Sequence, residues 1–218
     1  MFMYRLHCFA QSGNAFKVAF MLRALELPFE AVHVAFLDGA TADPAWRDAH
    51  NEMGEAPVLE DGDLRLTQSG AILTYLAKKH GHFGGVTEAE QLEVLRWLLF
   101  DNHKFTSYYA TYRFMKALGK HRPDPVILKF LLSRIEGAFN IVDQHLASSA
   151  YIVGDSPTIA DFSMSGYHFF PQEESGIDVA GRWPHIGAWL ERLKALPGWA
   201  SPYDVMPGER LPPRWPDA

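Results

Sequence analysis

Ser12, Gly13 and Asn14 are the first residues whose types and position could do chemistry. They lie where an apolar run that begins at Tyr4 stops and a helix-like pattern starts. Serine and asparagine oxygens cap helix N-termini, so one function of these residues is purely structural. The N-terminus of a helix also binds anions. The stretch therefore predicts a helix cap, an anion site, or both.

A second group of polar residues lies at two later junctions. Gln68 and Ser69 open a predicted helix, and in Ala56-Pro57 a proline enters a predicted strand. Proline in a sheet belongs at an edge or at the first residue of a strand, and X-Pro bonds are where cis peptides occur. A cis peptide would turn the backbone groups of Ala56 toward an open side. An extended peptide could pair there as an added strand, with helix N-termini for its anionic groups.

Several other chemistries lack their sequence signatures. Ser12 has neither a Gly-x-Ser-x-Gly motif nor an adjacent base, and Gly13 stands without the further glycines of a phosphate loop. The single cysteine, Cys8, excludes a Cys-x-x-Cys pair, and its place inside a strand pattern favours a buried, inert thiol. Of the ten histidines only His80 and His82 are closely spaced, in a glycine-rich loop, so we expect no metal site.

Composition limits the classes of function. The 218-residue chain is 48% hydrophobic and 21% charged, as in ordinary globular proteins. Its net charge of −6 argues against nucleic-acid binding, which needs clustered Lys and Arg. No apolar run reaches the ~20 residues of a membrane span. Residues 1–7 alternate like a strand and lack the apolar stretch of a signal peptide, and one cysteine suits a reducing compartment, so we expect a cytoplasmic protein.

The first 82 residues mix predicted strands and helices. The patterns predict strands over 4–9 and 29–36, helices over 15–27 and 45–50, a hairpin of 58–60 and 64–66 around Asp61-Gly62, and a helix from Ser69 to Gly81. A strand–helix–strand connection gives a right-handed parallel pair, and the hairpin adds antiparallel strands. We therefore predict an α/β domain over residues 1–82, a mixed βαβ–ββα sheet covered by helices.

Residues 87–218 show no convincing strand pattern and are predicted to form an all-helical domain. Thr87 and Glu90 form a capping box, as do Thr158 and Asp161. The predicted helices run from Thr87 to Leu118, from Asp124 to about Ala147, from Thr158 to before Pro171, and from Pro184 to Leu196. The proline-rich tail from Pro207 is predicted to be irregular.

Three stretches together resemble the glutathione transferase family across nearly the whole chain. They are "SGNAFKV" on the first helix, "EAPVLEDGDLRLTQSGAILTYLA" over 55–77, and "GDSPTIADFSM" over 154–164. The resemblance implies a thioredoxin-like N-terminal domain, an all-helical C-terminal domain, glutathione as co-substrate and a homodimer. It implies a transferase that adds the glutathione thiolate to a small electrophile.

The family resemblance also implies roles for the junction residues. Ala56, before a cis Pro57, would pair through its backbone with the cysteinyl part of glutathione. Gln68 and Ser69 would hold its γ-glutamyl end. Ser12 would donate a hydrogen bond to the sulfur, as in serine-type bacterial-looking members, and Asn14 is a second candidate donor. Capping alone remains open for the residues of both helix starts.

The second domain would supply the electrophile pocket. Tyr108 and Tyr112, four residues apart on one helix, and Arg113 are the candidates. Core packing is the stronger explanation for most of the aromatic residues on this helix. Asp101 is a candidate to reach the γ-glutamyl amine across a dimer interface, because some family classes use an acidic residue on this helix.

One loop departs from the family pattern. Relatives usually carry a basic residue after the second strand for the glycyl carboxylate, whereas residues 38–43 read Asp-Gly-Ala-Thr-Ala-Asp. Glu55 replaces the common glutamine, and His50 is a substitute candidate for the glycyl end. The altered loop leaves a non-catalytic binding module as one alternative to conjugation. The resemblance leaves another, isomerase or disulfide or peroxide reductase chemistry on the same fold, because some family members catalyse such reactions.

Overall fold

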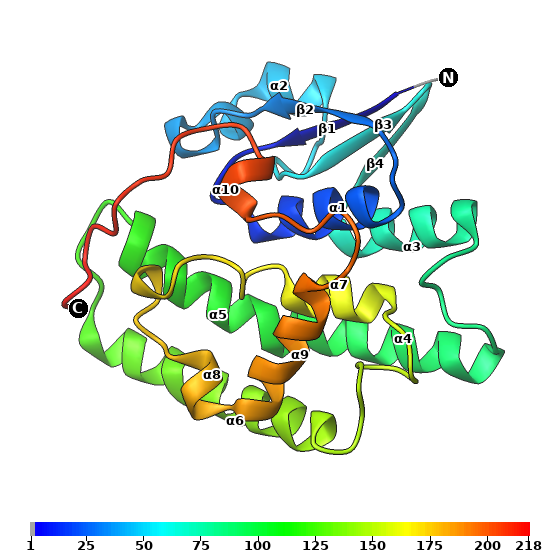
Figure 1. The fold of residues 1–218 in the computed structure, drawn as a ribbon. Helices are drawn as coiled ribbons and strands as arrows, with labels where there is room; N and C mark the ends of the chain where they lie inside the picture. The colour runs from blue at the N-terminus through cyan, green and yellow to red at the C-terminus, as the bar shows by residue number, and fades with distance from the viewer. Residues whose placement is uncertain (1–2) are drawn as a thin grey trace. The chain divides into compact units, whose positions relative to one another are not determined.

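A computed structural model describes residues 3–218 (Figure 1). Residues 1 and 2, with which the predicted N-terminal alternation begins, lie outside the described part. The chain forms two compact units. The sheet unit contains the residues up to His82 together with Leu196–Arg210. The helical unit contains Phe83–Ala195 and Leu211–Ala218.

The sheet unit contains the predicted βαβ–ββα arrangement. Its elements are β1 (Tyr4–Cys8), α1 (Gly13–Ala24), β2 (Phe29–His33), α2 (Pro44–Ala49), β3 (Val58–Asp61), β4 (Leu64–Thr67), α3 (Ser69–His80) and α10 (Pro202–Val205). The strand order is β2-β1-β3-β4; β1 and β2 are parallel, and β3 is antiparallel to both β1 and β4. This confirms the predicted thioredoxin-like sheet, with each predicted boundary within four residues.

The strand register brings three distant junctions to the same end of the sheet. His7 near the end of β1 faces Val58 at the start of β3, and Val58 faces Thr67 at the end of β4. The residues that follow β1, precede β3 and follow β4 therefore meet at one edge. Those are the junctions that the sequence singled out.

Alternation along the strands determines what the sheet packs against. Leu6 and Leu59, which pair across β1 and β3, are fully buried, as is Phe16 on α1. Helix α1 is almost wholly buried, and α3 places Ile72, Leu73 and Leu76 in the core by their helical spacing. The two helices are thus held tightly, which fixes the position of their N-termini.

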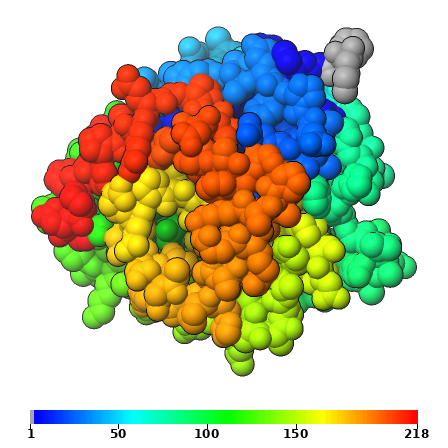
Figure 2. All heavy atoms as spheres, viewed as in Figure 1, coloured from blue at the N-terminus to red at the C-terminus, as the bar shows by residue number. Residues whose placement is uncertain are grey.

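The segment Leu196–Arg210 returns to the sheet unit. The Gly198 carbonyl accepts a hydrogen bond of 2.6 Å from Arg23 Nε, and the Glu209 carbonyl accepts one from Gln11 Nε2. In Figures 1 and 2 this orange-red segment lies against the blue residues of the first strands and helix. The domain range of 87–218 predicted from sequence includes this segment, but its contacts group it with the sheet unit.

The helical unit has no strand among its described residues. Its helices are α4 (Glu88–Phe100), α5 (Thr106–Arg113), α6 (Pro125–Leu146), α7 (Ile159–Ser165), α8 (Val179–Arg182) and α9 (Pro184–Lys194). Both predicted capping boxes form, at Thr87–Glu90 and at Thr158–Asp161. Phe105, Phe139, Phe162 and Trp189 are buried in its core. No helix among residues 3–218 is long and apolar enough to cross a membrane.

The first long helix of this unit runs without a break from Glu88 to Leu118, as predicted, but its winding is not uniform. Two π-helical segments, Asp101–Phe105 and Phe114–Leu118, follow α4 and α5. At the first of them the Thr106 N–H donates to the Asp101 carbonyl and, at 3.2 Å, to its carboxylate. A buried carboxylate that binds the chain five residues later favours the wider turn. Apolar spacing alone does not reveal such a segment.

Candidate active site

Ser12 is the N-cap of α1. Its Oγ accepts a hydrogen bond of 3.1 Å from the Ala15 N–H, and the residue is only 4% exposed. The extended backbone at Ser12, with φ −86° and ψ 105°, is that of an N-cap. The cap uses the oxygen as an acceptor, and no hydrogen bond described for residues 3–218 uses the hydroxyl proton. Ser12 can therefore cap the helix and still donate to an anion.

Asn14 and Cys8, the two rivals of Ser12, lie in different surroundings. Asn14 is in the first turn of α1 and is partly exposed. Cys8 ends β1 and is fully buried, and this burial raises the pKa of its thiol to about 12. A thiol that stays protonated at neutral pH is neither a nucleophile nor a metal ligand. The prediction that this cysteine is buried is confirmed.

The Ala56–Pro57 peptide bond is cis, as the sequence predicted. Pro57 is buried directly before β3, whereas Ala56 is partly exposed. Among the described residues, no backbone hydrogen bond uses the N–H or carbonyl of Ala56. These groups are available to an extended peptide in the manner of an added strand.

Gln68 and Ser69 lie at the start of α3. Gln68 has φ +66°, an uncommon conformation for a residue with a side chain, and its Nε2 donates to Glu55 Oε2 at 2.7 Å. Ser69 is the first residue of α3 and is 7% exposed, and its hydroxyl has no hydrogen bond among those described. The positive end of a twelve-residue helix and a hydroxyl thus lie at the same edge of the sheet as Ala56.

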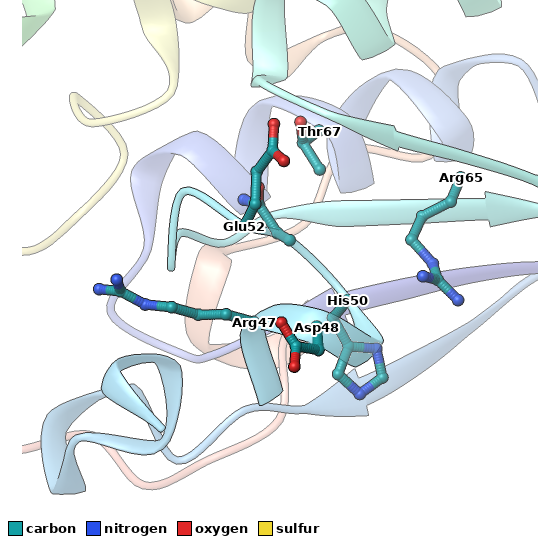
Figure 3. Close-up of a pocket in the computed structure, with 7 residues that line it drawn as sticks. Arg47, Asp48, His50, Glu52, Arg65 and Thr67 are labelled. Carbon is teal, nitrogen blue, oxygen red and sulfur yellow. The ribbon is translucent and has the colours of Figure 1, made fainter. Parts of the chain in front are cut away.

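His50 lies at the end of α2, where its ring is tilted against those of Trp46 and His7. The ring centroids are 5.2 Å and 4.7 Å apart. His50 also lines a cavity of about 380 Å³ together with Arg47, Asp48, Asn51, Glu52, Arg65 and Thr67. In Figure 3 the α2 side and β4 contribute side chains to this cavity, and Thr67 directly precedes Gln68. The cavity therefore adjoins the candidate site.

Arg47 is a cavity residue that sequence patterns did not select. Its Nε donates to the Thr41 carbonyl at 3.1 Å, and its guanidinium lies so close to Gly54 that a side chain there would meet it at 2.8 Å. Gly54 also has φ +68°, so both the close guanidinium and the backbone conformation favour glycine at this position. The available signal was that Arg47 is the first basic residue after the acidic loop at 38–43.

The helical unit holds the predicted electrophile-pocket residues in unequal surroundings. Tyr108 is half-buried, and Tyr112 is 8% exposed, where burial raises the pKa of its phenol. Tyr109 points into the core, where its hydroxyl lies 3.1 Å from Ser175 Oγ. Tyr108 is thus the more accessible of the two predicted tyrosines.

Arg113 and Asp101 are both fully engaged inside the helical unit. Arg113 is 2% exposed, donates from Nε to Glu174 Oε2 at 2.8 Å, and lies over the Phe170 ring. Asp101 is fully buried and accepts a hydrogen bond of 2.6 Å from Ser163 Oγ besides those from Thr106. These placements argue against the roles predicted for Arg113 in a substrate pocket and for Asp101 at a dimer interface. Their charged groups are paired within the helical unit.

A thioredoxin-like unit that carries polar helix N-termini beside a cis-proline, in one chain with an all-helical unit, defines a narrow class of proteins. Sequence profiles agree with this class. The profile described as "Glutathione S-transferase, N-terminal domain" matches residues 4–78, and "Glutathione S-transferase, C-terminal domain" matches residues 121–197. The chain belongs to the glutathione S-transferase family of enzymes.

Individual relatives match nearly the whole chain. Glutathione S-transferase 3 of Zea mays is 30% identical over 96% of this chain and 96% of its own length. Glutathione S-transferase F14 of Arabidopsis thaliana is 27% identical over 95% of this chain and 88% of its own. Among solved structures, a glutathione S-transferase from Pseudomonas fluorescens Pf-5 is 31% identical, with a TM-score of 0.82 over 92% of this chain and 99% of that chain.

Proposed function

We propose that this protein is a glutathione transferase that adds the glutathione thiolate to a small electrophile, with Ser12 as the donor to the sulfur. The observation that carries the proposal is the state of the Ser12 hydroxyl. Its oxygen is held by the Ala15 N–H, while its proton is left to donate at the N-terminus of α1. In the reaction the sulfur lone pair forms the S–C bond, and the electrophile's leaving group departs with the displaced electron pair.

The same edge of the sheet would hold the tripeptide. The free backbone groups of Ala56 would pair with the cysteinyl residue in a strand-like manner, aided by the cis Pro57. Ser69, with the positive end of α3, would bind the γ-glutamyl carboxylate, and Gln68 would orient that end of the ligand. A structure described as a Lodderomyces elongisporus homologue "with two GSH per subunit" shares the fold, with a TM-score of 0.85.

Arg47 supplies the positive charge that the acidic loop lacks. Its Nε is held by the Thr41 carbonyl, and Arg47 lines the same cavity as His50. A guanidinium binds a carboxylate through two parallel hydrogen bonds. We assign the glycyl carboxylate to Arg47, with His50 as a neighbour on the same cavity wall.

The energetics of thiol activation fit these parts. A free thiol titrates near ~8.5, and lowering this pKa by two units needs about 2.7 kcal/mol of preference for the thiolate. A hydrogen bond to a charged group contributes ~1.5–3 kcal/mol, and a helix N-terminus contributes ~0.3–1 kcal/mol. Ser12 at the start of α1 provides both contributions in one place.

Substitution of Ser12 by alanine tests the proposal. We expect Ser12→Ala to raise the pKa of the bound glutathione thiol, read from the pH dependence of thiolate absorbance, by about one to two units. Turnover of a generic aryl halide at neutral pH should fall about tenfold or more. Asn14→Ala is the matched variant on the same helix turn. An unchanged thiol pKa in Ser12→Ala with a raised one in Asn14→Ala would transfer the role to Asn14.

The alternative reactions are separable by substrate. Reduction of disulfides or peroxides by glutathione proceeds most directly through a reactive protein cysteine, and Cys8 is buried with a pKa of about 12. A substrate panel that shows strong disulfide reduction without aryl halide turnover would favour that alternative. Calorimetry that detects no glutathione binding up to millimolar concentration would favour the non-catalytic module.

An apolar surface on the helical unit supports a homodimer. Leu92, Leu95 and Leu99 on α4 are each at least half exposed and recur at the spacing of one helix face. On α6, Val126 and Phe130 are also more than half exposed. Such faces mark association sites in water-exposed proteins. Mass measurement in solution should give twice the chain mass, and Leu95→Glu should give the single-chain mass. We further propose a cytoplasmic location, in keeping with the free, buried Cys8.

A further inference from the structure

Folding brings together two histidines and a carboxylate that are far apart in sequence. His7 lies on β1, His50 ends α2, and Glu60 lies on β3. One ligand atom from each of the three, an imidazole nitrogen or a carboxylate oxygen, lies within 4.8 Å of the other two. The His7 Nε2 to Glu60 Oε1 distance is 3.1 Å.

The two imidazoles leave buried nitrogens without hydrogen bonds. His7 is only 4% exposed, yet its Nε2 has no hydrogen bond of acceptable geometry, even to Glu60. His50 Nδ1 is likewise buried and without a partner. Buried polar atoms in folded proteins almost always have a partner, and each exception calls for a physical explanation. A shared ligand between the two rings would satisfy both nitrogens at once.

We propose that His7, His50 and Glu60 form a binding site for a divalent transition-metal ion of the Zn²⁺ type. Two imidazole nitrogens and one carboxylate oxygen are a ligand set typical of zinc with an open fourth position. Zinc–nitrogen bonds of ~2.0–2.1 Å place tetrahedral ligand atoms roughly 3.3 Å apart. The His7–Glu60 distance already meets this spacing, and the remaining closure falls to His50, whose ring is only partly buried.

The cavity beside His50 gives an ion access to one of the three ligands. His50 lines this space of about 380 Å³ along with Asp48 (Figure 3). It also has room for the water that would complete the coordination. His7 is buried, and its ring centroid lies 4.7 Å from that of His50, so an ion held by both would join the end of α2 to the central strands.

Two guanidinium groups oppose a cation at this place. Arg5 Nη1 lies 2.9 Å from Glu60 Oε2, and Arg65 Nε lies 3.7 Å from Glu60 Oε1. Their charges compete with the ion for the carboxylate and lower its affinity. We therefore expect that removal of the Arg65 charge increases the affinity of the site for the metal ion.

Binding of Co²⁺, which reports coordination through visible absorption, tests the site on the full chain without a histidine tag. After chelator treatment and its removal, we expect one equivalent of Co²⁺ per chain with a ligand-field band, and displacement of the band by Zn²⁺. His50→Gln and Glu60→Gln should lose the band and at least tenfold in affinity. His121→Gln, an exposed histidine of the helical unit, is the matched control and should keep both.

Arg65→Gln makes the test sharper, since it should strengthen Co²⁺ binding by about tenfold. Adventitious binding elsewhere would not respond to this residue. Absence of a stoichiometric band in the wild type, or a band that persists in His50→Gln, would overturn the proposal. Circular dichroism of each variant, and a Zn²⁺-dependent rise in melting temperature seen in the wild type but not in His50→Gln, separate metal loss from misfolding. None of these readouts depends on glutathione chemistry.

Discussion

Glu55 Oε2 accepts a hydrogen bond from Gln68 Nε2 at 2.7 Å. The two residues belong to different junctions, since Glu55 precedes the cis Ala56–Pro57 bond and Gln68 precedes α3. Gln68 is held with φ +66°, a conformation that costs free energy and persists only where neighbouring groups enforce it. The hydrogen bond therefore couples the position of the open backbone at Ala56 to the start of α3.

Removal of the Glu55 acceptor should weaken glutathione binding without changing the chemical step. We expect Glu55→Ala to raise the KM for glutathione about five- to tenfold, with kcat within a factor of two, since a lost hydrogen bond costs ~0.5–1.5 kcal/mol. Glu55→Gln keeps an acceptor oxygen and should stay within twofold of wild type in KM. Steady-state kinetics at saturating electrophile gives both constants. A fall in kcat without a change in KM would contradict this account.

Arg47 should act on one end of glutathione only. We expect Arg47→Ala to raise the KM for glutathione about tenfold, because a charge-assisted hydrogen bond contributes ~1.5–3 kcal/mol. Glutathione esterified at its glycyl carboxylate lacks the group that Arg47 would bind. The ester should therefore bind wild type and Arg47→Ala with equal affinity in calorimetry. A difference between them as large as for free glutathione would place Arg47 elsewhere.

The buried pair of Arg113 and Glu174 should govern stability rather than substrate use. Both side chains are at most 2% exposed. Breaking a buried ion pair leaves an uncompensated charge, so Glu174→Gln should lower the free energy of unfolding by about 3–5 kcal/mol in urea titrations. Glu93→Gln, which breaks the exposed pair with Arg96, is the control and should cost less than about 1 kcal/mol. Equal losses in both variants would refute the buried-pair argument.

The capping box of α4 should contribute to the loss of folding stability at acid pH. Hydrogen bonds from the backbone N–H groups of Thr87 and Val86 hold the pKa of Glu90 below its usual value. A carboxyl with a lowered pKa in the folded state stabilises the fold above the unfolded pKa of about 4.3, and this stabilisation is lost as pH falls through the folded pKa. Unfolding measured between about pH 6 and pH 3 should therefore show a shallower acid loss in Glu90→Gln than in wild type. Glu88→Gln, two residues earlier in the same turn, should keep the wild-type slope.

Cys8 should be unreactive while the protein is folded. Burial raises the pKa of its thiol to about 12, so almost no thiolate exists at pH 8. A thiol reagent should label less than a tenth of the native chains in the time that labels all chains in denaturant. Cys8→Ala should keep transferase turnover within about twofold of wild type. Rapid stoichiometric labelling of the native protein would restore Cys8 as a candidate nucleophile.

Local sequence signals predicted much of the fold. The capping boxes at Thr87 and Thr158 were predictable because their partners lie three residues on, and the hairpin because Asp61-Gly62 suits a tight turn. The cis bond at Ala56–Pro57 was expected from proline at a strand start together with the family pattern. The π-helical segment at Asp101 was not, since it depends on a buried carboxylate whose partner Ser163 is 62 residues away.

Site residues were predictable where a single strand–helix junction determines their position. They were not predictable where their position depends on packing between distant segments. Ser12 was selected because a helix N-cap and a hydrogen-bond donor to an anion both call for a hydroxyl residue at the start of a helix. Arg113 was assigned to a pocket because helical spacing does not reveal its ion pair with Glu174, which is buried in the core. His7 and His50 are far apart in the sequence, so no motif pointed to them. The fold of the sheet and α2 brings their ring centroids to a distance of 4.7 Å.

The segment Leu196–Arg210, which binds Arg23 and Gln11, has a consequence for the order of events during synthesis. Domains generally fold as they leave the ribosome, N-terminal part first. Here the residue next to Ser12 meets its partner Glu209 only after the whole helical unit has been translated. Nascent chains halted before residue 196 should hold a sheet unit that exchanges amide hydrogens faster than the released protein, so the thiol site would be finished last although its sequence is made first.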